Sequence, residues 1–255
     1  MLAALHGPSR YQCVSAVYFG MNTLQAELRR LYRFDDANRQ TPDDEEPDLI
    51  TPDGRVRAMV LELARPADWN ALSAVWQGVQ VDLELPAPAI AVSGIDGYQL
   101  WFSLAEPVTT AQAATFLEAL RLRYLSALPT ERIGMMPCAN QHARSVPALQ
   151  PDTGRWSAFV APDLAALFAD SPWLDVCPSP EAQANVLSRF ACIKPAVFQA
   201  AMERLKPTSK TAAAPLTSIT DTGLDPKLFL LGVMNNPAIA MPLRIDAAKA
   251  LLPYC

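Results

Sequence analysis

The strongest constraint in the sequence is a hairpin pattern over residues 89–104, which read AIAVSGIDGYQLWFSL. Two apolar runs flank a short turn, and the turn holds two of the chain's 10 glycines, Gly94 and Gly97. Apolar runs joined by a short glycine-containing turn are typical of a β-hairpin. Glycine also lets backbone come close to a ligand. A tight hairpin is therefore the simpler interpretation, and a phosphate bound by backbone N–H groups of the turn is the alternative.

Strand parity divides the side chains of the second run between two faces. One parity is apolar and predicts a core face: Tyr98, Leu100, Phe102 and Leu104. The other parity is mixed and predicts a face toward helices, solvent or a ligand: Gln99, Trp101 and Ser103. An aromatic ring such as that of Trp101 can stack on a base, although aromatic residues in half-buried strands more often belong to a core.

The elements expected around the hairpin predict an α+β domain. Further strands are expected over residues 55–63, 132–136 and 156–160. Helices are expected over residues 66–83, 162–168, 180–190 and 195–205, with another beginning at Thr109, whose capping box Gln112 completes. The order strand, helix, hairpin, helix, strand, strand predicts a mostly antiparallel sheet with helices packed on one face.

Composition divides the chain into four parts. These are an N-terminal helix and acidic linker at 1–54, the α+β domain at 55–206, a linker at 207–224 and a helical pair at 225–255. The N-terminal part begins its amphipathic helix near Asn22, which can act as a cap. We therefore interpret residues 1–20 as a flexible or misassigned extension.

Net charge, cysteine and histidine content, and hydropathy disfavour several classes of protein. The formal net charge of −5 disfavours a generally basic grip on DNA, although a local basic groove remains open. Five scattered cysteines without C-x-x-C indicate reduced thiols in a cytoplasmic protein. Two histidines disfavour a structural zinc site of the usual Cys/His type. No apolar run is long enough for a membrane span, so we expect no membrane association.

The segment LPAPAIAVSGIDGYQLWFSLAEPV, residues 85–108, resembles the second motif region of archaeo-eukaryotic primases, in the primase-polymerases of plasmids and phages. The shared features are Leu-Pro-x-Pro at 85–88, Ser-Gly-x-x-Gly at 93–97 and an aromatic, apolar opening of the next strand. The family carries a histidine where this chain has Gln99. The resemblance covers about residues 55–206 and implies a primase-polymerase-like fold.

The resemblance also implies an upstream strand that ends in Asp-x-Asp and holds two metal ions. The corresponding stretch here is RAMVLELARP, in which Glu62 stands for the first carboxylate and Ala64 occupies the second position. Asp163 is the nearest candidate for a third carboxylate. Two-metal phosphoryl transfer needs clustered carboxylates. The resemblance therefore implies a degraded catalytic set, and Mg²⁺ or Mn²⁺ would be needed only if catalysis survives.

Three functional hypotheses follow. The first is a noncatalytic protein of a mobile element or phage that binds single-stranded nucleic acid or nucleotide. Its binding residues would be Ser93, Gly94, Gly97, Gln99 and Trp101, with Glu62 beside them and Arg144 reaching over from the polar loop at 137–155. The second is a noncatalytic module that binds a protein through the C-terminal helices. The third is an active metal-dependent nucleotidyltransferase that uses Glu62 and Asp163.

Overall fold

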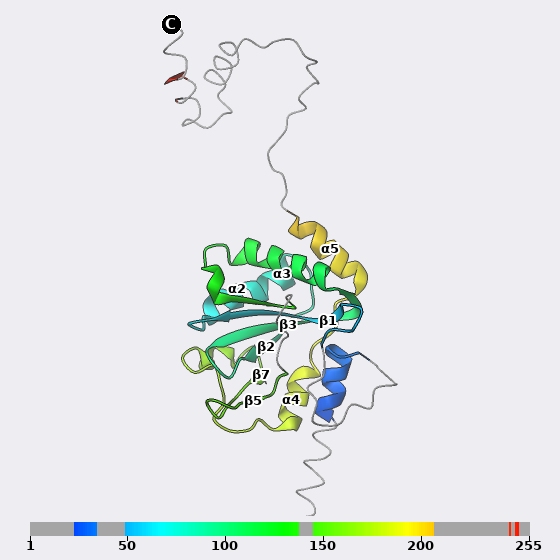
Figure 1. Cartoon of the computed structure of the whole chain (residues 1–255), viewed down its shortest axis with the longest axis vertical. Helices are drawn as coiled ribbons and strands as arrows, with labels where there is room; N and C mark the ends of the chain where they lie inside the picture. Colours follow the sequence, from blue (N-terminus) through cyan, green and yellow to red (C-terminus); the bar gives the residue numbers. More distant parts are fainter. Residues whose placement is uncertain (1–22, 35–48, 138–144, 207–244, 246–247, 250–255) are drawn as a thin grey trace, which may run out of the picture. The chain divides into compact units, whose positions relative to one another are not determined.

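The computed structural model describes residues 23–34, 49–137, 145–206, 245 and 248–249 (Figure 1). Contacts divide the chain into two units, Met1–Thr208 and Ser209–Cys255. In the second unit only three residues are described, and all three are helical: Ile245, Ala248 and Lys249. The rest of the expected C-terminal helical pair, the linker at 207–224 and residues 1–20 lie outside the described residues.

The first unit is an α+β fold built on a five-stranded antiparallel sheet in the order β4-β1-β3-β2-β7. Its strands are β1 (Arg55–Ala64), β2 (Ala89–Val92), β3 (Gly97–Thr109), β4 (Ile133–Met136) and β7 (Ala158–Val160). The helices are α2 (Trp69–Val81), α3 (Thr110–Tyr124), α4 (Pro180–Leu187) and α5 (Pro195–Leu205), and residues 23–31 are also helical. From β1 to β4 the chain follows the split β-α-β-β-α-β order.

Local signals set the ends of the helices. Asp68 caps α2 by accepting a hydrogen bond from the Ala71 N–H at 3.0 Å. Thr109 caps α3, and its capping box is complete because the Gln112 side chain accepts from the Thr109 N–H at 3.1 Å. Satisfying these otherwise unpaired N–H groups contributes about 1 kcal/mol per cap. The expected cap at Thr109 is confirmed, whereas α2 begins three residues later than expected, after Asp68.

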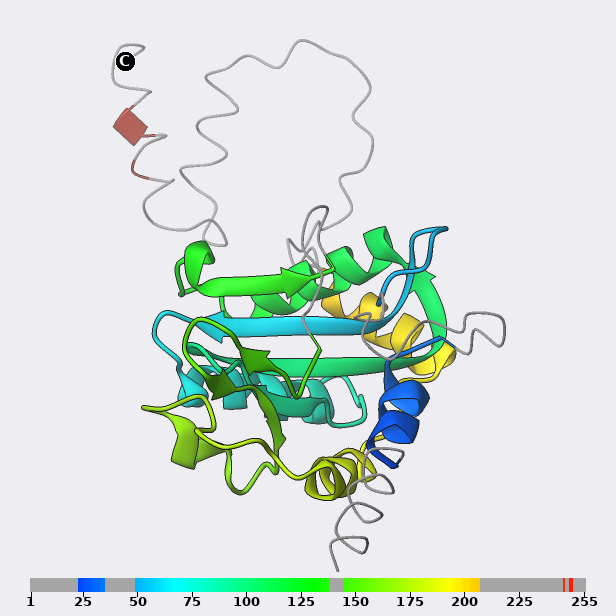
Figure 2. The same cartoon turned by 60° about the horizontal axis from the view of Figure 1, so that its bottom comes forward.

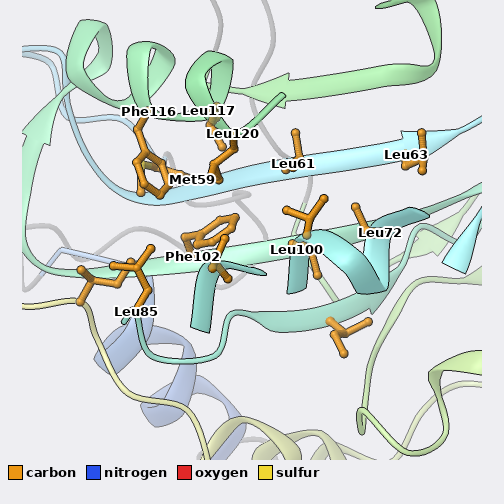
Figure 3. Packing of buried hydrophobic residues seen from close by; sticks show 14 of the residues in the cluster. Met59, Leu61, Leu63, Leu72, Leu85, Leu100, Phe102, Phe116, Leu117 and Leu120 are labelled. Carbon is orange, nitrogen blue, oxygen red and sulfur yellow. The ribbon is translucent and has the colours of Figure 1, made fainter. Parts of the chain in front are cut away.

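The first face of the sheet is a continuous apolar core beneath α2, α3 and α5 (Figure 1), and Figure 3 shows part of its packing. Alternate residues of the two central strands supply its floor: Met59, Leu61, Leu63, Tyr98, Leu100, Phe102 and Leu104. Phe102 meets Phe116 of α3 edge-on, with ring centroids 5.6 Å apart. The expected core parity of β3 is thus confirmed. Each fully buried side chain of this size stabilises the fold by about 1.5–3 kcal/mol.

The second face of the sheet is also covered, and this corrects the expectation of helices on one face only. The helix over residues 23–31 and α4 lie side by side on it (Figures 1 and 2). They bury a second apolar cluster that includes Leu28, Leu31, Ala58, Val60, Trp101, Phe159 and Leu187. The reason is the composition of this face, because small and aromatic apolar residues occupy most of it and require cover.

Two arginines hold the helices on the second face in place by donating hydrogen bonds to backbone carbonyls. Arg57 of β1 donates to the carbonyls of Arg30 at 3.0 Å and Arg33 at 2.7 Å, at the end of the 23–31 helix. Arg30 in turn donates to the carbonyls of Leu187 at 3.0 Å and Phe190 at 2.9 Å, at the end of α4. Carbonyls at a helix C-terminus lack partners within the helix and interact favourably with cations. These contacts tie β1 to both covering helices.

Three expected elements differ in the structure. The strand expected over 156–160 is two strands, because β6 (Arg155–Trp156) pairs with β5 (Leu149–Gln150) while β7 pairs with β2. The helix expected over 162–168 is a 3-10 turn over Ala165–Phe168. The polar loop at 137–155 contains β5, and its residues 138–144 lie outside the described residues. Among the described residues, no helix has the length and apolar character needed to cross a membrane.

Candidate functional site

The turn of the hairpin uses its own N–H groups. The Ser93 hydroxyl oxygen accepts hydrogen bonds from the N–H groups of Ile95, Asp96 and Gly97 at 3.0–3.2 Å. The Gly94 N–H donates to the Pro172 carbonyl at 3.0 Å. Because every N–H from Gly94 to Gly97 has a partner within the protein, the turn offers no free donors to a phosphate.

Packing explains why both turn positions are glycine. Gly94 has a φ of +80°, and a Cβ there would lie 2.7 Å from the backbone nitrogen of Ser157. A Cβ at Gly97 would lie 2.8 Å from the Cβ of Ala64 on β1. Neither approach is possible for a residue with a side chain without a shift of backbone. The hairpin interpretation therefore accounts for both glycines, and the phosphate alternative is not needed.

Glu62 and Gln99 form a polar pair on the two central strands, near the end of the sheet where the hairpin turns. They are direct partners across β1 and β3, and the row continues to Gly134 on β4 and Ala91 on β2. The Gln99 amide donates to the Glu62 carboxylate at 3.2 Å. The Gln99 carbonyl oxygen accepts from the Trp101 indole N–H at 2.9 Å. The sheet register thus brings together two of the residues expected in one site.

Trp101 is a core residue, which corrects its expected place on a binding face. Its side chain is 3% exposed, and its rings lie 5.2 Å from Tyr32 and 5.7 Å from Phe159, both edge-on. Its neighbour on the same face, Ser103, is buried as well and donates to the Ala191 carbonyl. Aromatic stacking on a base needs an open ring face. The 23–31 helix, which carries Tyr32 at its end, covers the face of Trp101 instead.

The electrostatic surroundings of Glu62 favour its protonated form more than water does. Burial raises the pKa of this carboxyl above its ordinary value, and the neighbouring carboxylate of Asp96 raises it further. The hydrogen bond from Gln99 and the charge of Arg65 act in the opposite direction. Within the described part of the chain, this half-buried carboxyl has one hydrogen-bond partner, the neutral amide of Gln99.

The expected carboxylates do not meet at Glu62. Asp163 is exposed and follows β7, whose Phe159 lies on the same row of the sheet as Glu62. Phe159 is three strands away from Glu62 along this row, a distance of ~14 Å. Ala64, at the second carboxylate position, is buried against Gly97. Among the described residues, no group of three or more histidine, cysteine, aspartate or glutamate side chains could hold a metal ion.

The arginines at this end of the sheet are directed to backbone carbonyls. Arg65 donates to the Glu131 carbonyl at 2.9 Å, and Arg132 donates to the Pro66 carbonyl at 2.8 Å. Arg144, expected to reach over the site, lies outside the described residues. Sequence reasoning missed Gly134 and Asp96 as neighbours of Glu62. The sequence places Asp96 in the turn beside Gly97, which is a signal that it lies near the site. The position of Gly134 beside Glu62 depends on the pairing of β4 with β1, for which the sequence gives no local signal.

Comparison with known proteins adds no family. No family model matches the chain, and no curated protein matches it. The candidate site therefore rests on the geometry of Glu62, Gln99 and Gly134, which we call the Glu62 site.

Proposed function

We propose that this chain is a noncatalytic nucleic-acid or nucleotide-binding protein, similar to a degenerate primase-polymerase of a mobile element or phage. The observation that supports this most is the pairing of Glu62 with Gln99. The resemblance assigns these two positions to one site from separate motifs, and in the fold they are hydrogen-bonded partners on adjacent strands at 3.2 Å. The binding surface is the end of the second face that holds the Glu62 site.

Two features support the noncatalytic part of the proposal. Ala64 supplies no ligand at the second carboxylate position, and Asp163 is three strands away from Glu62. Gln99 is a buried neutral amide that donates to Glu62 and accepts from Trp101, whereas the histidine of the family can carry a positive charge. Binding by hydrogen bonds is therefore better supported than phosphoryl transfer.

Fluorescence anisotropy with labelled single-stranded DNA tests the proposal, with a nucleoside triphosphate as competitor in the presence and absence of Mn²⁺. We expect saturable binding that weakens about tenfold in Gln99→Ala, since Gln99 positions the Glu62 carboxylate through a hydrogen bond and such a bond is worth roughly 1 kcal/mol or more. Glu106→Gln is the matched control, because Glu106 lies on the same strand and is exposed. Absence of binding to either ligand contradicts the proposal, and nucleotide incorporation with Mn²⁺ contradicts its noncatalytic part.

A second candidate function, binding of a protein partner, is favoured by one surface. Leu167 is 76% exposed and Val176 is 71% exposed, and both lie in a segment with the exposed aspartates Asp163, Asp170 and Asp175. Exposed large apolar side chains can mark protein interaction sites. Cross-linking in the source cells would distinguish the two functions. A partner that is lost in Leu167→Asp and kept in Gln99→Ala supports this second function.

A further inference from the structure

The Glu62 carboxylate has one oxygen that is open to a ligand. Oε1 accepts from Gln99, while Oε2 has no hydrogen bond in the described part of the chain. Buried side-chain oxygens without a partner are absent among the described residues. Because Oε2 lacks a partner there, it is not one of the buried oxygens. Glu62 is half-buried, so Oε2 reaches the protein surface. A carboxylate oxygen accepts hydrogen bonds and cannot donate them when ionised.

Gly134 provides the opening at this oxygen. It is the direct partner of Glu62 across β1 and β4. A Cβ at Gly134 would lie 3.1 Å from Oε2, which is closer than an ordinary van der Waals contact. The missing side chain therefore leaves the carboxylate uncovered on the side of β4, the edge strand of the sheet.

The charges and donors around Oε2 disfavour an anionic ligand group. Asp96 adds a second negative charge near Glu62. The N–H groups of the hairpin turn are used within the turn or by Pro172. The charge of Arg65 acts on Glu62 in the opposite direction, and its guanidinium donates to the Glu131 carbonyl. A phosphate here would meet repulsion and no free backbone donor of the turn, whereas a neutral N–H donor would meet an unsatisfied acceptor.

We propose that the Glu62 site recognises the edge of a nucleobase by accepting a hydrogen bond from its amino group, and does not bind phosphate. This inference rests on the proposed function and names the part of the nucleotide that the site contacts. Glutamate accepting from the amino group of cytosine is an established form of base recognition. Adenine and guanine also carry amino groups, so the chemical class is an amino-bearing base.

Two oligonucleotides that differ only in this donor test the inference. One is an oligodeoxycytidine, and the other is the same oligonucleotide built from N4,N4-dimethylcytosine, which keeps the phosphates and the stacking surface and lacks the amino N–H groups. We expect the full-length protein to bind the oligodeoxycytidine about tenfold more tightly, in line with the loss of a hydrogen bond to a charged group.

Three variants locate the effect. Glu62→Ala removes the acceptor, and Gly134→Ala keeps the charge while placing a methyl group over Oε2. Both should bind the two oligonucleotides equally, and circular dichroism confirms that each variant is folded. Glu106→Ala, which removes an exposed carboxylate elsewhere on β3, should keep the full preference.

The outcomes separate this inference from the function on which it rests. Equal binding of both oligonucleotides by the unmodified protein overturns the inference and leaves nucleic-acid binding intact. A preference that survives in both Glu62→Ala and Gly134→Ala overturns it as well. Absence of binding to either oligonucleotide overturns the inference and the proposed function together.

Discussion

The two faces of the central sheet are built differently. The first face is apolar from end to end and lies beneath three helices. The second face combines an apolar cluster, covered by the 23–31 helix and α4, with a polar row at Glu62 and Gln99. The difference shows that a ligand-binding interpretation fits only part of the second face. Most of that face is core, and the proposed binding surface is the end that the helices leave polar.

Removal of the Trp101 side chain should have the largest effect. Because the indole is enclosed by Tyr32 and Phe159, Trp101→Ala should lower the free energy of unfolding by about 3–5 kcal/mol, as for other large core residues. Phe102→Ala is the matched change on the first face and should cost a similar amount. Urea denaturation measures both. A cost below about 1 kcal/mol for Trp101→Ala would show that the second face is open around it.

Loss of the Arg57 guanidinium should come next. Arg57→Ala removes the guanidinium that donates to the Arg30 and Arg33 carbonyls and leaves Arg30 only the weak thiol donor of Cys192 among the described residues, so we expect destabilisation of about 1–3 kcal/mol and faster proteolysis near the 23–31 helix. Arg55→Ala is the control, because its 3.8 Å ion pair with Asp53 is exposed and worth little. Equal unfolding free energies for the two variants would contradict a fastening role for Arg57.

Two of the three described glycines with positive φ offer a sharper comparison. Gly94→Ala and Gly54→Ala both place alanine at a φ near +80° and +73°, which costs roughly 1–2 kcal/mol. Only Gly94→Ala adds a clash, since nothing lies within 4 Å of a Cβ at Gly54. Thermal unfolding should therefore show a clearly larger loss for Gly94→Ala. Similar losses would mean that the turn does not need close packing against Ser157.

The smallest expected effect is the pH dependence that Glu62 contributes. Its pKa is raised in the folded state, so the folded protein holds this proton over a range in which the unfolded chain has released it. Stability therefore falls as pH rises from about 4.5, the ordinary pKa, through the raised value. Glu62→Gln should match the unmodified protein below that range and be the more stable of the two above it. The opposite trend in urea denaturation would contradict a raised pKa.

Local sequence signals predicted much of the first face and little of the second. Strand parity placed Leu100 and Phe102 in the core, and the capping box at Thr109 predicted where α3 begins, because both depend on neighbours in sequence. The cover over Trp101 depends on a helix that precedes β1 and on α4, far along the chain. Amphipathic periodicity predicts that a helix buries one face. It does not predict which other element that face packs against.

The candidate site shows the same limit. Glu62 and Gln99 were expected to be neighbours from two motifs, and the register of β1 and β3 brings them together. Gly134 could not be predicted, because its contribution depends on which strand pairs with the other edge of β1. The two hydrogen bonds between the Gln183 side chain of α4 and the Phe159 backbone of β7 could not be predicted for the same reason. Such contacts arise only once distant elements have packed.

The most direct test of binding at the Glu62 site is a nuclear magnetic resonance titration of the isotope-labelled protein with oligodeoxycytidine. We predict that the amide signals of Glu62, Gln99 and Gly134 shift on binding while those around Leu28 and Leu187 in the apolar cluster stay unchanged. A titration that leaves the three site residues unshifted, or that moves only the signals around Leu167 and Val176, would contradict binding at this end of the sheet.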